Sequence, residues 1–146
     1  MDELIKLLDE HLDYVSHEIS DDTITIHVIS NREEAACPYC GFMSSKTHST
    51  YERSLQDLPI MGMKTWIVIK NRKLFCLNPD CNHTTFAETF DFLPSKGKKS
   101  KRLLDKIVDV SLGVSSVDAS IILKNGIVDV GKSTICNLLK KKSPLT

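Results

Sequence analysis

The chain has 146 residues, of which 41% are hydrophobic and 26% charged, with 19 basic and 19 acidic side chains and no net charge. This length suits one domain or two small modules, and the composition excludes collagen-like and wholly disordered proteins. No apolar run approaches the roughly 20 residues of a membrane-spanning helix, and the acidic, amphipathic first residues are unlike a signal peptide, so we expect a cytoplasmic protein with no membrane partner.

The first half of the chain predicts one helix and then strands. Residues 1–12 have leucines at helical spacing, which predicts a short amphipathic helix. Two β-like runs follow at 14–19 and 23–29, and apolar and polar residues alternate in the second, as in a half-buried strand. A longer strand is predicted over 64–75, and the segment 47–55 is a candidate to pair with it.

Four of the five cysteines form two close pairs, Cys37 with Cys40 and Cys76 with Cys81. Each pair lies in a segment with turn residues such as proline, glycine and asparagine. Tetrahedral zinc takes four soft ligands, and two tight turns with two thiolates each supply them. We therefore predict one structural Zn²⁺ ion held by these four cysteines, in a closed site with no open position for a catalytic water.

Other interpretations of the cysteines are weaker. Two disulfides are not expected in a cytosolic chain. His83, which lies two residues after Cys81, and His48 could compete as ligands, but four thiolates already complete the zinc shell. The fifth cysteine, Cys136, lies outside both pairs beside an apolar helix face, and we interpret it as a small buried hydrophobe.

The character of the sequence changes at the segment 94–102, which is basic, lacks apolar side chains and predicts a linker or arm. A helical apolar face follows over 103–111. Ser115 with Asp118 resembles a capping box that opens a second helix. A third helix is predicted over 132–142. The last third of the chain therefore predicts three short helices.

Three short helices with a glycine-containing turn before a basic last helix fit a helix-turn-helix, which reads double-stranded DNA. If Ile135, Leu138 and Leu139 face inward, the opposite face presents short polar groups that reach base edges and lysines that suit phosphates. The basic arm could follow the DNA backbone or enter the minor groove. The candidate DNA-binding residues are Lys132, Ser133, Thr134, Asn137, Lys140 and Lys141 of the helix, with Lys98, Lys99, Lys101 and Arg102 of the arm.

The neutral total hides an uneven charge distribution. Residues 1–36 contain ten acidic and two basic side chains, whereas residues 96–146 contain four acidic and eleven basic ones. A basic tail favours a polyanionic partner such as DNA. The alternative is a solvated helix end that the helix dipole stabilises, and the connection over 124–131 is longer than the turn of the simplest helix-turn-helix.

Residues 126–133 match the phosphate-loop pattern G-x-x-x-x-G-K-[ST]. A phosphate cradle needs a preceding buried strand and inward-turned backbone amides. Three of the four residues between the two glycines are β-branched and apolar, and they resist such a loop. No later strand follows that could complete a nucleotide site. We therefore interpret the match as coincidental and expect no bound nucleotide.

Several motifs together resemble the N-terminal region of bacterial insertion-sequence transposases of the ISL-three family. The resemblance covers about residues 37–142 and includes the helical segment after the basic linker. The motifs that carry it are Cys37-Pro38-Tyr39-Cys40-Gly41, Tyr51, Arg53, Leu55, Asp57-Leu58-Pro59, Gly62, Arg72, Phe75-Cys76, Asn78-Pro79, Cys81 and Phe86-Ala87-Glu88.

This resemblance implies a zinc-binding domain and a helix-turn-helix DNA-binding domain, ahead of a ribonuclease-H-like catalytic domain. The present chain stops at Thr146, where that catalytic domain would begin. The acidic side chains crowd into residues 1–36 and are interpreted as a solvated face, not as metal-binding carboxylates of the kind that transposition needs. We therefore expect no catalytic residue and no enzyme activity.

The expected fold is α+β, with a β-rich zinc-ribbon-like domain and an N-terminal helix at 1–93, the basic linker at 94–102, and a small three-helix helix-turn-helix domain at 103–146. The expected function is a zinc-stabilised DNA-binding module of a transposase that recognises the ends of an insertion element. The alternative is a protein-interaction or regulatory remnant that binds itself or a full-length transposase through the ribbon and the acidic helix. A nucleotide hydrolase acting through Lys132, or a nuclease, is the weakest interpretation.

Overall fold

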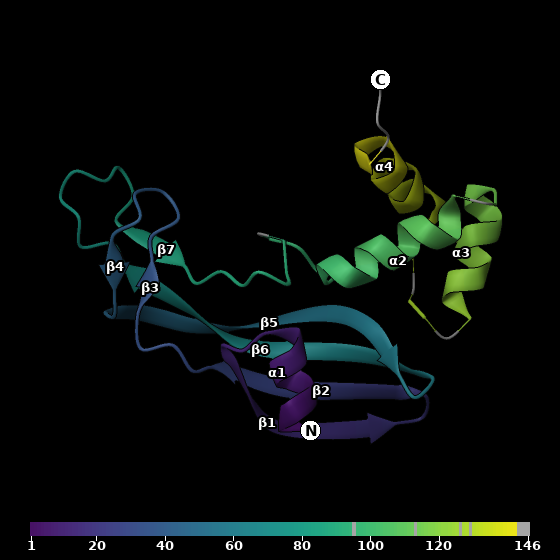
Figure 1. Cartoon of the computed structure of the whole chain (residues 1–146), viewed down its shortest axis with the longest axis horizontal. Coiled ribbons are helices and arrows are strands. Elements are labelled where there is room, and N and C mark those ends of the chain that lie inside the picture. Colours follow the sequence, from purple (N-terminus) through teal and green to yellow (C-terminus); the bar gives the residue numbers. More distant parts are fainter. Residues whose placement is uncertain (95, 113, 126, 129, 143–146) are drawn as a thin grey trace. The chain divides into compact units, whose positions relative to one another are not determined.

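The computed structural model of the chain describes residues 1–94, 96–112, 114–125, 127–128 and 130–142. The fold is mixed α+β (Figure 1). None of the helices in these ranges is long and apolar enough to cross a membrane. The helices are α1 (Asp2–Leu8), α2 (Lys101–Ser111), α3 (Ser116–Lys124) and α4 (Lys132–Lys142), and the strands are β1 (Leu12–Ser20), β2 (Thr23–Ser30), β3 (Ala35–Ala36), β4 (Met43–Ser44), β5 (Thr47–Ile60), β6 (Met63–Phe75) and β7 (Thr85–Ala87).

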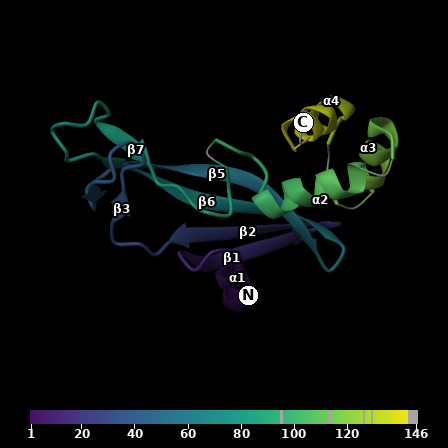
Figure 2. The ribbon, with the colours of Figure 1, turned by 45° about the horizontal axis from the view of Figure 1, so that its top comes forward.

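The long strands pair in the order β1-β2-β6-β5, and β7 also pairs with β6 (Figure 2). The short strands β3 and β4 form a separate two-stranded sheet. The alternation predicted for the second strand is confirmed, because Ile24, Ile26 and Val28 of β2 are all buried. The predicted strand at 47–55 is the first part of the longer β5. Met61 and Gly62 join β5 to β6 with φ angles of 50° and 78°, which is the left-handed geometry of a two-residue hairpin turn.

Helix α1 ends four residues before the predicted limit. Asp9 adopts an extended conformation, and its carboxylate accepts a hydrogen bond from the backbone N–H of His11 at 2.8 Å. This local bond competes with continuation of the helix, so the chain turns and Leu12 begins β1. Ile5 is the buried residue of α1, whereas Leu4 and Leu7 of the predicted apolar stripe are exposed.

The chain divides into two compact units, and neither is one continuous stretch of sequence. The prediction divides the chain once, at a linker, whereas parts of the long strands belong to each unit. Unit 1 contains Met1–His17, Ile26–Ser54 and Val68–Asp91, and unit 2 contains Glu18–Thr25, Leu55–Ile67 and Phe92–Thr146.

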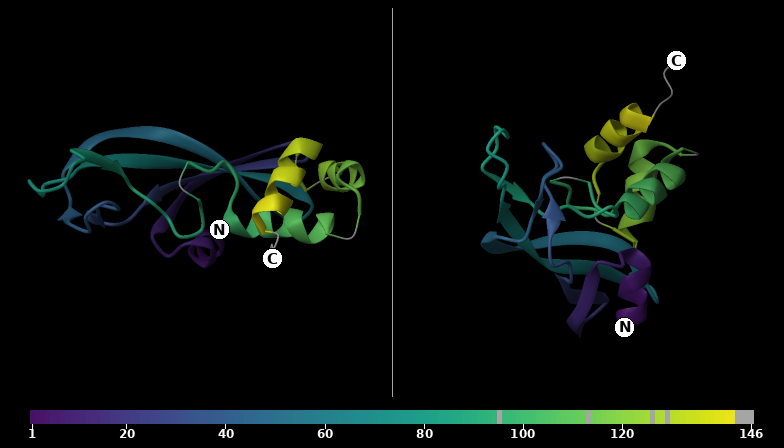
Figure 3. Two further views of the ribbon diagram at one scale, coloured as in Figure 1. Left: turned by 90° about the horizontal axis from the view of Figure 1, so that it is seen from above. Right: turned by 60° about the vertical axis from the view of Figure 1, so that its left-hand side comes forward.

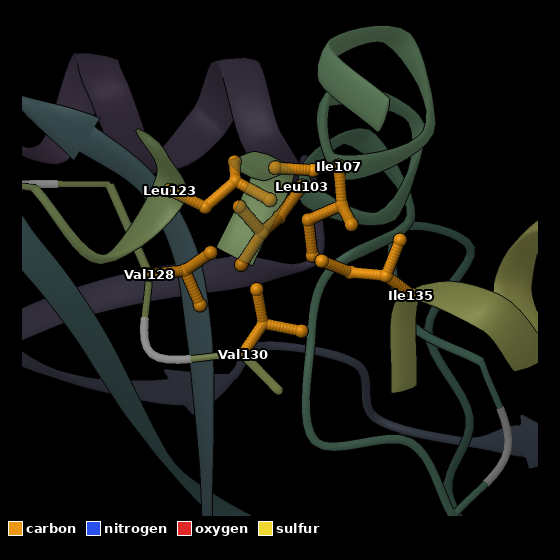
Figure 4. Packing of buried hydrophobic residues seen from close by; sticks show 7 residues of the cluster. Leu103, Ile107, Leu123, Val128, Val130 and Ile135 are labelled. Carbon is orange, nitrogen blue, oxygen red and sulfur yellow. The ribbon is translucent and has the colours of Figure 1, made fainter. Parts of the chain in front are cut away.

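Helices α2, α3 and α4 of unit 2 pack against one another (Figure 3). Ser100 and Ser115 cap α2 and α3, and the Oγ of Ser115 accepts from the backbone N–H of Asp118 at 3.1 Å, as the sequence predicts. The helices share one apolar core, whose side chains point toward one another in Figure 4. Its buried members are Leu103, Ile107, Ala119, Leu123, Val128, Val130 and Ile135.

The segment that matches the phosphate-loop pattern contributes to this core. Residues 126 and 129 lie outside the described residues, but Val128 and Val130 are buried. The backbone N–H of Val128 donates to the carbonyl of Leu123 at 2.8 Å, and the hydroxyl of Ser120 donates to the carbonyl of Val130 at 2.6 Å. Of the three β-branched residues in this segment, Val128 and Val130 are therefore core residues, and the partly buried Ile127 packs against the same core.

Candidate metal centre and nucleic-acid interface

The first cysteine pair lies in the turn of a small hairpin in unit 1. Strands β3 and β4 pair with Ala35 opposite Ser44. The backbone N–H of Cys37 donates to the carbonyl of Phe42 at 3.0 Å, and that of Gly41 donates to the carbonyl of Cys37 at 2.8 Å. Gly41 has a φ angle of 79°, where a side chain would be strained, so glycine is the residue that lets this turn close behind Cys40.

The second cysteine pair lies between β6 and β7, which pair with Leu74 opposite Phe86. Cys76 follows β6 directly, as predicted, and its backbone N–H donates to the carbonyl of Thr84 at 2.9 Å. The backbone N–H of Cys81 donates to the carbonyl of Asn78 at 3.1 Å. The two strands and these bonds fix a second loop with two cysteine side chains.

These two loops bring the predicted ligands together. The four sulfur atoms of Cys37, Cys40, Cys76 and Cys81 all lie within 4.8 Å of one another, and the sulfurs of Cys40 and Cys76 are 3.6 Å apart. Zinc–sulfur bonds of about 2.3 Å in a tetrahedron place the sulfurs about 3.8 Å apart, whereas a disulfide needs about 2.05 Å. The donor set and its spacing therefore fit Zn²⁺, and none of the four cysteines forms a disulfide.

The histidine that could compete as a ligand has another role. The ring of His83 stacks on the ring of Tyr39, with centroids 3.5 Å apart and planes 5° from parallel. The backbone N–H of His83 donates to the sulfur of Cys81 at 3.4 Å. Among the described residues, the metal-ligating cluster contains only the four cysteines. The stack joins the two cysteine loops across the site, a contact between distant residues that the sequence analysis missed.

A small apolar core supports the cysteines from one side. Ala35, Cys37, Leu74 and Phe86 are buried together, and Cys76 and Cys81 pack against them. The same strands that place the cysteines also supply this core. The cluster is too small to hold a fold by itself, so the metal carries much of the stability of this region.

The thiols differ in how readily they ionise. The pKa of Cys40 is lowered to about 6, first by the backbone N–H of Phe42 and then by the side chain of Asn78. The backbone N–H of Asn78 favours the thiolate of Cys76, yet burial and the neighbouring cysteines raise the pKa of Cys76 to about 12. The pKa of Cys81 is also raised, because burial and Cys40 outweigh the backbone N–H of His83. One thiolate forms readily, and a bound cation favours ionisation of the others.

Helix α4 in unit 2 presents the predicted DNA-binding residues on its outer side. Ile135 is buried, and Leu138 and Leu139 pack against the helical core, so the predicted inward face is confirmed. The side chain of Lys141 lies outside the described residues. The exposed side chains of this helix include Lys132, Ser133, Thr134, Asn137 and Lys140.

The predicted basic arm is bonded to β5 within unit 2. The backbone N–H of Gln56 donates to the carbonyl of Lys98, and that of Ser100 donates to the carbonyl of Gln56, both at 2.9 Å. Lys98 and Lys101 are exposed, whereas Lys99 is half-buried. These bonds fix the segment, so it does not behave as a free linker.

Arg102, the last candidate of the arm, is held by a buried carboxylate. Its guanidinium forms two hydrogen bonds to Asp57, of which the one from Nε to Oδ1 is 2.8 Å long. The hydroxyl of Ser100, which caps α2, donates to the same Oδ1 at 2.7 Å. Asp57 therefore orients the start of α2. The sequence does not indicate this role, because Asp57 and Arg102 lie far apart in it, although Asp57 belongs to the Asp57-Leu58-Pro59 motif.

Residues 33–81 match the family model for the zinc-finger of transposase IS204/IS1001/IS1096/IS1165. This segment is an ISL3-type zinc ribbon. It contains all four cysteines of the cluster, which hold one structural zinc ion. No curated protein and no solved structure matches the chain significantly. The ribbon match ends before the helices of unit 2, so the function of those helices rests on their own residues.

The affinity of the zinc ribbon for zinc is expected to fall with pH. At neutral pH Cys40 is a thiolate, whereas Cys76 and Cys81 carry protons that zinc must displace. Release of at least two protons makes the association constant fall by about 100-fold or more for each pH unit lowered. The zinc-dependent stability therefore falls as the pH falls, most steeply below about pH 6, where Cys40 also binds a proton.

Competition with a chromophoric chelator, repeated at several pH values, measures this dependence. A pH indicator in weak buffer counts the released protons independently. An association constant that stays the same over two pH units, after correction for the chelator, contradicts the prediction.

Proposed function

We propose that this chain is the zinc-stabilised DNA-binding part of an insertion-element transposase and that unit 2 binds double-stranded DNA through α4. The ribbon match supports the transposase class, and it supports DNA as the class of partner. In this proposal the three helices form a helix-turn-helix, with α4 entering the major groove and recognising the ends of the element. The proposal includes no catalytic step by the described residues.

The outer face of α4 is the observation that carries the proposal. Ser133, Asn137 and Lys140 are exposed and lie three or four residues apart, so they share one side of the helix. The buried Ile135 fixes the opposite side against the core. Short polar groups near the start of a helix can hydrogen-bond to base edges, and the lysine suits a phosphate.

In the proposal, the arm adds positive charge to the unit that contains this helix. Lys98 and Lys101 are exposed and belong to the same unit as α4. Arg102 acts mainly through Asp57 by orienting α2, so we rank it below these lysines as a phosphate contact. Because lysines displace condensed counterions from DNA, binding should weaken steeply with salt.

Two substitutions in α4 separate affinity from specificity. Lys140→Glu is expected to lower affinity for every duplex by about 10-fold and to reduce the salt dependence by about one unit in the log–log slope. Asn137→Ala is expected to narrow the preference for the target over random DNA by about 5- to 100-fold. Fluorescence anisotropy on a duplex from the element's end and on a random duplex measures both effects.

Lys70→Glu is the matched control, because Lys70 is an exposed lysine of β6 in unit 1. It changes net charge by the same amount and should leave both affinities within about 2-fold of wild type at moderate salt. If Lys140→Glu and Asn137→Ala bind both duplexes as the wild type does, α4 is not the recognition helix.

A second candidate function is a protein-interaction module, and one observation favours it. Leu4 is 49% exposed and Leu7 79% exposed on α1, so the helix presents apolar side chains outward. Such side chains suit a protein partner such as a full-length transposase. Leu4→Ser with Leu7→Ser tests this function without removing the buried Ile5, and unchanged capture of the transposase by this variant would exclude it.

A further inference from the structure

The four zinc ligands differ in how far solvent reaches them. Cys40 is exposed, whereas Cys37, in the same loop, is buried with 1% of its surface exposed. Cys76 and Cys81 of the second loop are half-buried. The sulfur is the nucleophile in cysteine oxidation, and a buried sulfur is inert because the oxidant does not reach it. Cys40 is therefore the ligand on which a small oxidant acts first.

A second sulfur lies close enough to complete a disulfide with Cys40. The sulfur of Cys76, in the other loop, is 3.6 Å away, so a disulfide needs the two atoms to approach by about 1.5 Å. Cys37 is the competing partner, because it belongs to the same loop as Cys40. Its side chain, however, is buried in the small apolar core with Leu74 and Phe86. The packing therefore favours a bond between the two loops over one within the first loop.

The stack of Tyr39 on His83 holds the two loops together beside this pair of sulfurs. Tyr39 precedes Cys40 directly, and His83 belongs to the loop that contains Cys76. The two rings are 3.5 Å apart and nearly parallel, so the contact does not depend on a bond between sulfur and metal. When Cys40 no longer serves as a ligand, the stack still keeps its loop against the other one. The two sulfurs therefore stay within reach of each other during oxidation.

We propose that the zinc ribbon is a peroxide-sensitive switch, in which a disulfide between Cys40 and Cys76 replaces the zinc ion as the link between the two loops. The ribbon is then held by the metal under reducing conditions and by the disulfide under oxidising ones. The proposal rests on the cysteine cluster of unit 1 and not on DNA binding by unit 2, so the failure of either leaves the other intact.

The oxidation takes two steps and consumes one hydrogen peroxide. The thiolate sulfur of Cys40 attacks one oxygen, the O–O bond breaks and hydroxide leaves, so that Cys40 becomes a sulfenic acid. The thiolate sulfur of Cys76 then attacks the sulfenic sulfur, the S–S bond forms, the S–O bond breaks and a second hydroxide leaves. Two protons convert both hydroxides to water, and the two cysteines supply the two electrons that reduce the peroxide. Cys37 and Cys81 are then too few ligands for a closed zinc site, so the metal is released.

Hydrogen peroxide added in excess to the zinc-loaded full chain tests the proposal. A chromophoric chelator should record the loss of one zinc per chain, and peptide mass mapping without reduction should find Cys40 joined to Cys76. Reduction in the presence of added zinc should restore the metal-bound state, because a disulfide is reversible and a sulfinic acid is not. Dimedone present during a brief exposure to peroxide should label Cys40 at least about 5-fold more than any other cysteine.

Tyr39→Leu tests the role of the stack while it keeps all four ligands. Without the stack, the effective concentration of Cys76 beside Cys40 falls, so the ratio of the Cys40–Cys76 disulfide to the Cys37–Cys40 disulfide should fall by at least about 3-fold. Tyr14→Leu is the matched control, because Tyr14 pairs with the ring of His17 elsewhere in unit 1. This control should give the wild-type ratio, and both variants should bind one zinc before oxidation.

Cys136→Ser controls for the cysteine outside the metal cluster and should release zinc at the wild-type rate. Zinc that stays bound in excess peroxide overturns the proposal. A wild-type disulfide within one loop, or a first dimedone label on a cysteine other than Cys40, overturns it as well. An unchanged disulfide ratio in Tyr39→Leu contradicts the role of the stack.

Discussion

Replacing Cys37 by serine is expected to abolish stoichiometric zinc binding and to unfold the ribbon. Cys37 is one of the four ligands and is 1% exposed. A serine hydroxyl stays protonated near neutral pH and is a poor zinc ligand, so only three thiolates remain. Structural zinc contributes about 10–16 kcal/mol in zinc-finger peptides, which far exceeds the stability of a typical small domain.

The loss extends beyond the metal itself. The buried side chain of Cys37 packs with Ala35, Leu74 and Phe86, and this core is too small to stay ordered when the two loops separate. The Tyr39–His83 stack joins the same two loops and should be lost with them. We expect disordered amide signals for residues 33–81 in a two-dimensional NMR spectrum.

Cys136→Ser provides the matched control, since Cys136 is the cysteine outside the metal cluster. Elemental analysis should find one zinc per chain in this variant and in the wild type, and close to none in Cys37→Ser. One zinc retained by Cys37→Ser, with an intact spectrum, would show that the cysteine cluster is not the zinc site.

Features decided by neighbouring residues were predictable from the sequence. The cysteine pairs could be assigned because each lies within one loop whose turn residues are adjacent to it. The start of α3 could be located because Ser115 caps the helix from one position before it, whereas α2 begins at Lys101, inside the segment predicted as a linker. The buried face of β2 followed from strict alternation. All of these signals act over a few residues.

Features decided by distant residues were not predictable. Asp57 and Arg102 lie far apart in sequence, and nothing local indicates that the basic arm is bonded to β5. The end of α1 depended on one Asp9 side chain competing with the helix, which periodicity does not register. The periodicity of α3 also failed to indicate which side faces its core, because apolar residues occupy both sides. Tertiary contacts determine the Asp57–Arg102 bonds and the orientation of α3, whereas the end of α1 is determined by a local side-chain bond between Asp9 and His11.

Glu88 is a second residue whose role emerges only from the fold. Its side chain is buried in unit 1, where the hydroxyl of Ser30 donates to Oε2 at 2.6 Å. The guanidinium of Arg72 forms two bonds to the carboxylate, of 3.1 Å to Oε1 and 3.2 Å to Oε2. Arg32 lies 3.6 Å from the same Oε2. One carboxylate therefore balances two arginines that are themselves mostly buried.

Glu88→Gln is expected to lower the free energy of unfolding by about 3 kcal/mol, although the substitution keeps the shape of the side chain. The glutamine leaves Arg72 and Arg32 without their buried counter-charge, and its amide places a donor where Arg72 also donates. Denaturant unfolding at fixed excess zinc measures the change and keeps the metal contribution constant. Glu33→Gln, at an exposed carboxylate of the same unit, should stay within about 0.5 kcal/mol of wild type.

A double-mutant cycle distinguishes the loss of the ion pair from the loss of side-chain packing. Glu88→Met and Arg72→Met are each expected to destabilise the protein by about 3 kcal/mol or more, because each leaves a charged partner behind. The double variant removes both charges and should be at least about 1 kcal/mol more stable than the sum of the single changes predicts. Additive effects, or a Glu88→Gln variant as stable as wild type, would mean that the buried charges contribute little. The expected coupling instead means that Glu88 and its partners Ser30, Arg32 and Arg72 stabilise unit 1 independently of the metal. These contacts join β2, β6 and the segment after β7.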